Sequence, residues 1–196
     1  ECTTGFRETL GGIHKKYKVN PDMAIFGKAL GNGYAITAVI GKKKIMDAAE
    51  NSFISSTFWT ERSGFTAAIK TLEIMKKTNS KKLIIEQGKK IQKIWKKLSK
   101  KHQIDISIIG IDSICSFVFN YKKQNYYKSL LTYKMLKYGF LSNNTIMVSI
   151  SHTDKIIAKY EKALDRSFEF ISKVINKKIK FKKKFELAYK GFYRLN

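Results

Sequence analysis

One lysine, Lys28, stands where the sequence could support covalent chemistry. It lies between a short apolar run, residues 23–26, and a glycine-containing turn, residues 31–33, and a second apolar run follows at residues 35–40. This pattern predicts a strand, a turn and a second strand, with the lysine held at the turn by rigid flanks. A lysine held in this way can be shielded from water, which favours the neutral amine that attacks a carbonyl carbon. The glycines, Gly31 and Gly33, permit positive φ and let a bulky ligand come close.

Position alone distinguishes Lys28 only modestly from an ordinary surface lysine. The chain contains 39 Lys and Arg residues, and most lysines in such a chain are solvated. Both interpretations therefore stay open on spacing alone.

The segment 27–41, GKALGNGYAITAVIG, resembles the cofactor-lysine segment of the class III aminotransferases. These are pyridoxal-phosphate (PLP) enzymes, and the family includes glutamate-1-semialdehyde aminomutase. The resemblance implies that Lys28 forms the Schiff base with PLP and that Asn32 and Gly33 shape the turn around the cofactor. The family usually has Pro after GNGY, where this chain has Ala35. That difference should relax the turn slightly and leaves the lysine unchanged.

The first residues resemble a second segment of the same family, DE-x-x-x-GFR. Glu1 matches the glutamate, and residues 5–7 match GFR. The family's preceding Asp, which pairs with the pyridine nitrogen of PLP, would fall just before Glu1. The resemblance therefore implies a C-terminal fragment that is inactive by itself, because protonation of that nitrogen makes PLP an electron sink.

A third segment, residues 56–61 with the sequence STFWTE, resembles a subgroup close to glutamate-1-semialdehyde aminomutase. The family segment carries a Thr that reaches the PLP phosphate of the neighbouring subunit, and Thr57 is that position. A hydroxyl suits this role because phosphate oxygens accept strong hydrogen bonds. The residues themselves also allow a plainer interpretation. Thr57 would be a satisfied loop hydroxyl, and the nearby aromatic residues would be core residues of a strand or loop packed on a partner surface: Phe53, Phe58 and Trp59.

Apolar periodicity predicts the remaining elements. The expected helices cover residues 42–50, 62–78, 81–101, 127–138 and 154–175; one or two strands, broken at Gly110, fall within 104–119, and a strand at 145–153 ends near His152. Ala67 and Ala68 should allow close packing of the helix 62–78, and Thr153 is among the candidate caps of the last helix. His14 is expected to be solvated. His152 has either a structural role, which we favour, or a place near the substrate mouth.

The resemblance covers residues 1–175 and implies the type I PLP fold, an α/β large domain with a mainly parallel sheet followed by a small α/β domain. Residues 1–80 would be the C-terminal part of the large domain. Residues 81–175 would be the connecting helix and the small domain, and residues 176–196 a basic tail. The family works as a homodimer whose active sites are shared between subunits.

The net charge of +24 would suit nucleic acid or an anionic membrane. Only four residues are Arg, however, and the lysines are spread along the whole chain, which favours compositional drift over specific nucleic-acid binding. The tail is either a binding arm or a loosely docked extension. No apolar run reaches the length of a membrane span. The two cysteines, Cys2 and Cys115, are far apart without metal-ligand spacing, which fits a reducing compartment and hence the cytoplasm.

The resemblance implies a PLP-dependent aminotransferase that acts on a small amine and a keto or aldehyde partner substrate. Lys28 would carry the cofactor and then, as a free amine, move the α-proton. The aminomutase reaction is the first alternative. A basic nucleic-acid- or membrane-binding module is the second.

Overall fold

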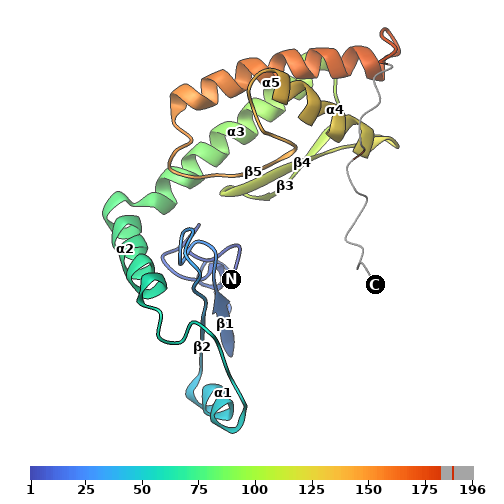
Figure 1. Ribbon diagram of the computed structural model, residues 1–196. Coiled ribbons are helices and arrows are strands. Elements are labelled where there is room, and N and C mark those ends of the chain that lie inside the picture. The colour runs from blue at the N-terminus through green and yellow to red at the C-terminus, as the bar shows by residue number, and fades with distance from the viewer. Residues whose placement is uncertain (182–186, 188–196) are drawn as a thin grey trace. The chain divides into compact units, whose positions relative to one another are not determined.

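The computed structural model describes residues 1–181 and Leu187. The chain divides into two compact units, Glu1–Ile85 and Glu86–Asn196. Each unit has its own sheet (Figure 1).

The first unit is built on a small antiparallel sheet. Strand β1 covers Met23–Phe26 and strand β2 covers Ala38–Gly41, with Phe26 opposite Ala38. The other elements are short 3-10 helices at Ile13–Lys15 and Asp47–Asn51, helix α1 at Lys43–Met46 and helix α2 at Arg62–Thr78. The strand predicted at 23–26 is confirmed. The second strand begins three residues later than expected, and the expected helix 42–50 is a short α-helix followed by a 3-10 turn.

The core of this unit joins β1 to α2. Phe26, Leu30 and Ala68 are buried together, and Phe6 and Ile36 pack against them. Helix α2 lies close to the segment before β2 because it has a glycine at the contact. A Cβ on Gly64 would lie 2.9 Å from the carbonyl oxygen of Ala35. The small residues that permit this packing are therefore Gly64 and Ala68, one helical turn apart, rather than Ala67 and Ala68.

The second unit combines three helices with a three-stranded sheet. Helix α3, Ser80–His102, begins in the first unit and lies mostly in the second. Strands β3 (Ile106–Ile111), β4 (Ile114–Phe119) and β5 (Thr145–Met147) pair antiparallel in the order β3-β4-β5. Helices α4 (Gln124–Lys137) and α5 (Asp154–Ile175) complete the unit.

Alternation along β4 builds the core of this unit. Cys115, Phe117 and Phe119 point to the buried face, where α3 and α5 cover the sheet (Figure 1). The Phe117 ring meets Trp95 of α3 edge-on, with 4.9 Å between centroids, and Phe168 of α5 at 5.8 Å. The Trp95 indole N–H donates to the Tyr160 hydroxyl oxygen at 2.9 Å, so the polar ends of both buried rings are satisfied.

Several predicted elements are confirmed and others are wrong. Helices 62–78 and 154–175 match α2 and α5, and the Thr153 hydroxyl accepts from the Ile156 amide as an N-cap. The strand 145–153 is too long, because the chain turns after Met147. Gly110 does not break the strand region: it lies inside β3 at φ +91°, and the break is the turn between β3 and β4. All strand pairs in the described residues are antiparallel, so the mainly parallel sheet is not seen there.

No helix among residues 1–181 is long and apolar enough to cross a membrane. Phe181 packs on Tyr133 and Phe170, with centroids 5.7 and 5.5 Å away. Most of the predicted basic tail lies outside the described residues.

Gly88 of α3 provides a test of the second unit. A Cβ at this position would lie 1.8 Å from the carbonyl oxygen of Asp112 in the β3–β4 turn. We expect Gly88→Ala to destabilise the protein by about 1–3 kcal/mol, although Ala favours a helix over Gly by about 1 kcal/mol. Urea unfolding would measure this. The exposed Lys93→Ala on the same helix should change stability by less than about 0.5 kcal/mol, and equal stability of both variants would contradict the packing.

Candidate active site

Lys28 lies just beyond the C-terminal end of β1, in a turn closed by backbone hydrogen bonds. The Leu30 amide donates to the Gly27 carbonyl at 2.8 Å, and the Asn32 amide donates to the Lys28 carbonyl at 2.9 Å. Lys28 itself has φ +36°, in the left-handed region. Such a backbone costs a non-glycine residue about 1–2 kcal/mol and is often found at functional sites. The predicted turn lysine is therefore present.

The Lys28 side chain is exposed in this chain, so the expected shielding from water is not provided by the described residues. Its amine is nevertheless fixed, because Nζ donates to the Thr3 hydroxyl oxygen at 2.8 Å. Sequence reasoning missed Thr3. The match of its neighbours to the family's GFR segment was the signal that could have drawn attention to it.

A cavity of about 700 Å³ opens beside Lys28 within the first unit. Its walls come from the turn after Lys28 and the start of β2, from the segment that precedes α2, and from the first turn of α2. The lining residues are Lys28, Tyr34, Ala35, Ile36, Thr37, Val39, Ile54, Ser55, Ser56, Phe58, Trp59, Glu61, Gly64 and Phe65. Aromatic faces with a few hydroxyl groups and one primary amine suit a small planar ligand that carries a carbonyl.

Thr57 does not line this cavity, although its neighbours do. It is exposed in a turn in which the Phe58 amide donates to the Ser56 hydroxyl at 3.2 Å and the Glu61 amide donates to the Phe58 carbonyl at 3.1 Å. No hydrogen bond of the Thr57 side chain is found among the described residues. The structure thus does not bring Lys28 and Thr57 into one pocket of one chain.

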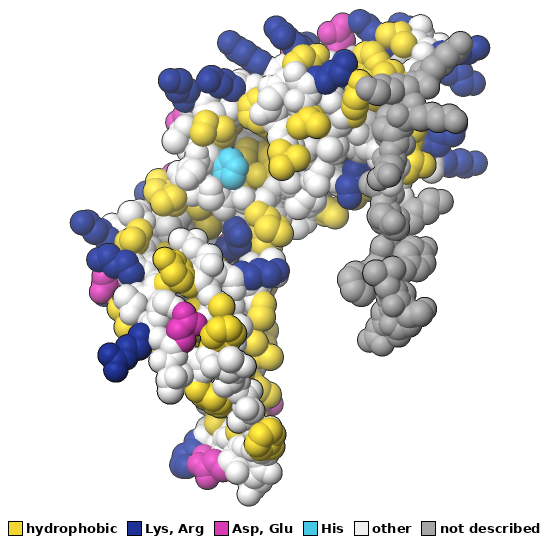
Figure 2. Space-filling model, in the orientation of Figure 1, with side chains coloured by type: hydrophobic (Ala, Val, Ile, Leu, Met, Phe, Trp, Pro, Cys, Tyr) yellow, Lys and Arg dark blue, Asp and Glu magenta, His cyan; other side chains and the backbone are white. Residues whose placement is uncertain are grey.

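The aromatic residues around Thr57 are not core residues of this chain. Phe53 is 96% exposed, Phe58 60% and Trp59 61%. The described residues of this chain do not bury them, and a core packed on a partner surface stays a prediction. Exposed hydrophobic side chains are visible over the part of the surface that the first unit forms (Figure 2).

Glu1 organises the loop that carries Thr3. Its carboxylate accepts from the Thr4 hydroxyl at 2.9 Å, the Ile13 amide at 2.9 Å, the His14 amide at 3.2 Å and the His14 ring Nδ1 at 3.1 Å. Burial raises the pKa of Glu1, but the hydrogen bonds from Ile13, Thr4 and His14 outweigh it and lower the pKa to about 2. His14, expected to be solvated, is instead partly buried against Glu1.

Arg7 holds the backbone of the same loop. Its Nε donates to the Thr3 carbonyl at 3.1 Å, and burial lowers the pKa of its guanidinium. The Cys2 thiol donates weakly to the Ile25 carbonyl at 3.7 Å, which ties the loop to β1. These contacts place Thr3 against Lys28.

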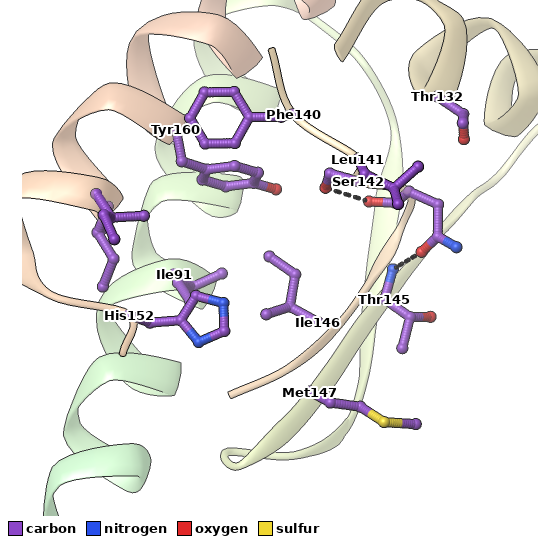
Figure 3. Close-up of a pocket in the computed structure, with 13 residues that line it drawn as sticks. Ile91, Thr132, Phe140, Leu141, Ser142, Thr145, Ile146, Met147, His152 and Tyr160 are labelled. Carbon is purple, nitrogen blue, oxygen red and sulfur yellow. Dashed lines mark hydrogen bonds between the residues drawn. The ribbon is translucent and has the colours of Figure 1, made fainter. Parts of the chain in front are cut away.

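His152 lies in the second unit, at a separate cavity of about 360 Å³. Its ring points into the space between Ile91 and Ile146 (Figure 3). Nδ1 accepts from the Ser149 amide at 2.9 Å and closes the turn ahead of α5. This contact supports the structural role that we favour for His152, and a role near substrate stays a prediction.

Comparison with known proteins identifies the family. The model of the class-III aminotransferases matches residues 1–175. The chain belongs to the class-III aminotransferase family. It is 31% identical over 185 residues to 3-aminobutyryl-CoA aminotransferase of Cloacimonas acidaminovorans, covering 89% of this chain and 44% of that protein. It is 30% identical to glutamate-1-semialdehyde 2,1-aminomutase of Methanococcus maripaludis, covering 84% and 42%.

Solved structures of the family share the fold. The FumI protein of Sphingopyxis sp. MTA144, in its PLP internal aldimine form, superimposes with a TM-score of 0.81 at 24% identity, over 88% of this chain and 42% of that one. An S-selective transaminase from Arthrobacter sp. gives 0.76 at 20% identity, over 89% and 44%. The class-III aminotransferase chain described here therefore has the α/β fold of part of a type I PLP-dependent transferase. It spans less than half the length of these relatives.

Class-III aminotransferases are PLP-dependent, and the residues of this chain fit that cofactor. Lys28 offers a fixed primary amine at the mouth of a cavity that has aromatic walls. Thr57 offers an exposed hydroxyl without a partner in the described part of the chain. Both are groups that the aldehyde and the phosphate of PLP can use.

The Glu1 network predicts a pH dependence. Because the pKa of Glu1 is lowered from 4.5 to about 2, its contribution to stability is complete above pH 4.5 and is lost as the pH falls toward 2. We expect the free energy of unfolding to fall more steeply between these pH values in the wild type than in Glu1→Gln. Urea unfolding at a series of pH values would measure this, and parallel curves for the two proteins would contradict the network.

Proposed function

We propose that this chain is the lysine-bearing part of a PLP-dependent aminotransferase, with Lys28 as the residue that holds the cofactor. The observation that carries the proposal is the fixed Lys28 amine at the cavity, in a chain that belongs to the class-III aminotransferase family. Because the chain spans less than half of its relatives, the activity is proposed for the complete protein.

The roles of the residues follow from their chemistry. PLP, when bound, supplies an electron sink for the carbon that loses a proton. Lys28 would bind the cofactor through Nζ and, as a free amine, would accept the proton from the substrate α-carbon. The turn that contains Asn32 and Gly33 would hold Lys28 in place.

The substrates are proposed to be a small amine and a keto or aldehyde compound. Transfer between two molecules is the first choice, because a relative at 31% identity is named an aminotransferase. Transfer within one molecule is the second candidate, because relatives at 30% identity are named aminomutases. An aminomutase converts one substrate without an added amino acceptor. Product formation without an acceptor would therefore support the aminomutase reaction, and a need for an acceptor would support the aminotransferase reaction.

A shared active site in a homodimer is also proposed. Thr57 lies outside the cavity of its own chain, and the residues that flank it expose large aromatic surfaces. Exposed apolar surface of this kind is typical of an interaction site. A second copy of the chain would cover the aromatic side chains and bring its Thr57 to the phosphate.

The cytoplasm is proposed as the location. Both cysteines are unpaired, Cys2 exposed and Cys115 buried, and burial raises the pKa of the Cys115 thiol to about 12. Unpaired thiols suit a reducing compartment. A basic nucleic-acid- or membrane-binding function is not proposed, because the family match accounts for residues 1–175.

Removal of the Lys28 amine tests the proposed cofactor attachment. We expect Lys28→Ala to abolish the covalent PLP adduct that is measured after borohydride reduction. No other residue that lines the cavity carries an amine. Peptide mapping by mass spectrometry would locate the reduced adduct. Lys44→Ala, a change at an exposed lysine, is the control and should retain the adduct. An adduct on another peptide in the wild type would overturn the assignment.

Removal of the Thr57 hydroxyl tests the proposed phosphate contact. Since a hydrogen bond to a charged group contributes about 1.5–3 kcal/mol, Thr57→Val should weaken PLP binding roughly 10- to 150-fold. Binding of pyridoxal, which lacks the phosphate, should not change.

Mixed dimers of Lys28→Ala and Thr57→Val subunits should regain one tight site, with PLP on the Thr57→Val subunit. Failure to regain it would show that Thr57 does not act across the interface.

A further inference from the structure

The contact between Thr3 and Lys28 carries an inference beyond the proposed function. Lys28 Nζ donates to the Thr3 hydroxyl oxygen at 2.8 Å, although the two residues are 25 positions apart. In the part of the chain that the structure describes, Lys28 makes no ion pair, so this hydroxyl is the acceptor that orients its amine.

The acceptor is anchored independently of Lys28. The Thr3 carbonyl accepts from Arg7 Nε at 3.1 Å, and the Arg7 amide donates to the Thr4 carbonyl at 3.3 Å. The Gly5 amide donates to the Glu1 carbonyl at 2.8 Å. Thr3 therefore lies in a hydrogen-bonded turn, and the bonds that hold this turn do not involve Lys28.

The loop also lies directly against the base of Lys28. A Cβ on Gly27, the residue before Lys28, would lie 3.8 Å from the Cys2 sulfur, in ordinary contact. The turn after Lys28 is closed by its own backbone bonds. Both ends of the Thr3–Lys28 contact are thus on rigid backbone, which limits the freedom of a long lysine side chain.

The chemical type of the acceptor matters. A carboxylate next to a lysine stabilises the charged ammonium and opposes its use as a nucleophile. A hydroxyl is neutral, and it can accept from the ammonium or donate to the neutral amine. Thr3 can therefore hold Lys28 in the same place in both protonation states.

We propose that Thr3 is a positioning residue for Lys28, which holds the amine at the mouth of the cavity without fixing it in the charged form. The inference uses the proposed function for its meaning, because positioning matters when Lys28 attaches a cofactor. The contact itself does not depend on that function.

The test compares Thr3→Val, which removes the hydroxyl at similar volume, with Thr3→Ser, which keeps it. The first measurement uses a small amine-acylating reagent on the full-length protein without cofactor, with the Lys28 peptide followed by mass spectrometry over a range of pH. Loss of a hydrogen bond that contributes about 0.5–1.5 kcal/mol should make Lys28 roughly two- to tenfold more reactive in Thr3→Val. Thr3→Ser should match the wild type.

The second measurement uses PLP with borohydride reduction. Here Thr3→Val should lower the fraction of adduct on Lys28 severalfold, because the amine is no longer held at the cavity, and Thr3→Ser should restore it. The same substitution at an exposed threonine of α2, Thr66→Val, should change neither measurement.

The two measurements separate the two ideas. Equal acylation of Lys28 in Thr3→Val and the wild type would overturn the positioning role. An absence of PLP adduct on Lys28 in the wild type would overturn the proposed function, and the acylation result would still decide the role of Thr3.

Discussion

The first unit depends on the packing of the buried Phe26 side chain. Its ring lies 5.1 Å from the ring of Phe6, and it is packed with Leu30 and Ala68. A Cβ on Gly5 would lie 2.8 Å from the Phe26 ring, so only glycine leaves room at that position. One side chain thus joins the N-terminal loop, the strand that ends before Lys28 and helix α2. Because Phe26 is two residues from Lys28, the same packing fixes the base of the lysine.

The second unit is stabilised by its aromatic core rather than by its many charges. Trp95, Phe117 and Phe168 are buried with edge-to-face contacts. Outside this core, lysines of α3 pair with carboxylates of α5 in register: Lys90 with Asp154, Lys97 with Glu161 and Lys101 with Asp165. The pKa of Asp154 is lowered chiefly by its hydrogen bond from Lys90, and that of Asp165 by its hydrogen bond from Lys101. Exposed pairs of this kind stabilise a protein only weakly. They therefore contribute more to the alignment of the two helices than to the stability of the unit.

The candidate site is assembled from segments that are distant in sequence. Lys28 supplies the amine, the loop around Glu1 and Arg7 supplies its acceptor, and the segment before α2 supplies the far wall of the cavity. Lys28 and the aromatic residues next to Thr57 are all exposed in this chain. The described residues leave these groups open to solvent and do not enclose them.

The sequence by itself determined the family, the strand that leads to Lys28 and the helices α2 and α5, because apolar periodicity and the residues around Lys28 are local signals. It did not determine the start of β2 or the end of β5, where backbone hydrogen bonds to distant segments decide the boundary. The role of Glu1 as the acceptor for Ile13 and His14, the exposure of Phe58 and Trp59, and the contact of Thr3 with Lys28 were decided only by the tertiary structure. Each of these depends on which segments meet in space, and residues 25 positions apart carry no periodic signal of that meeting.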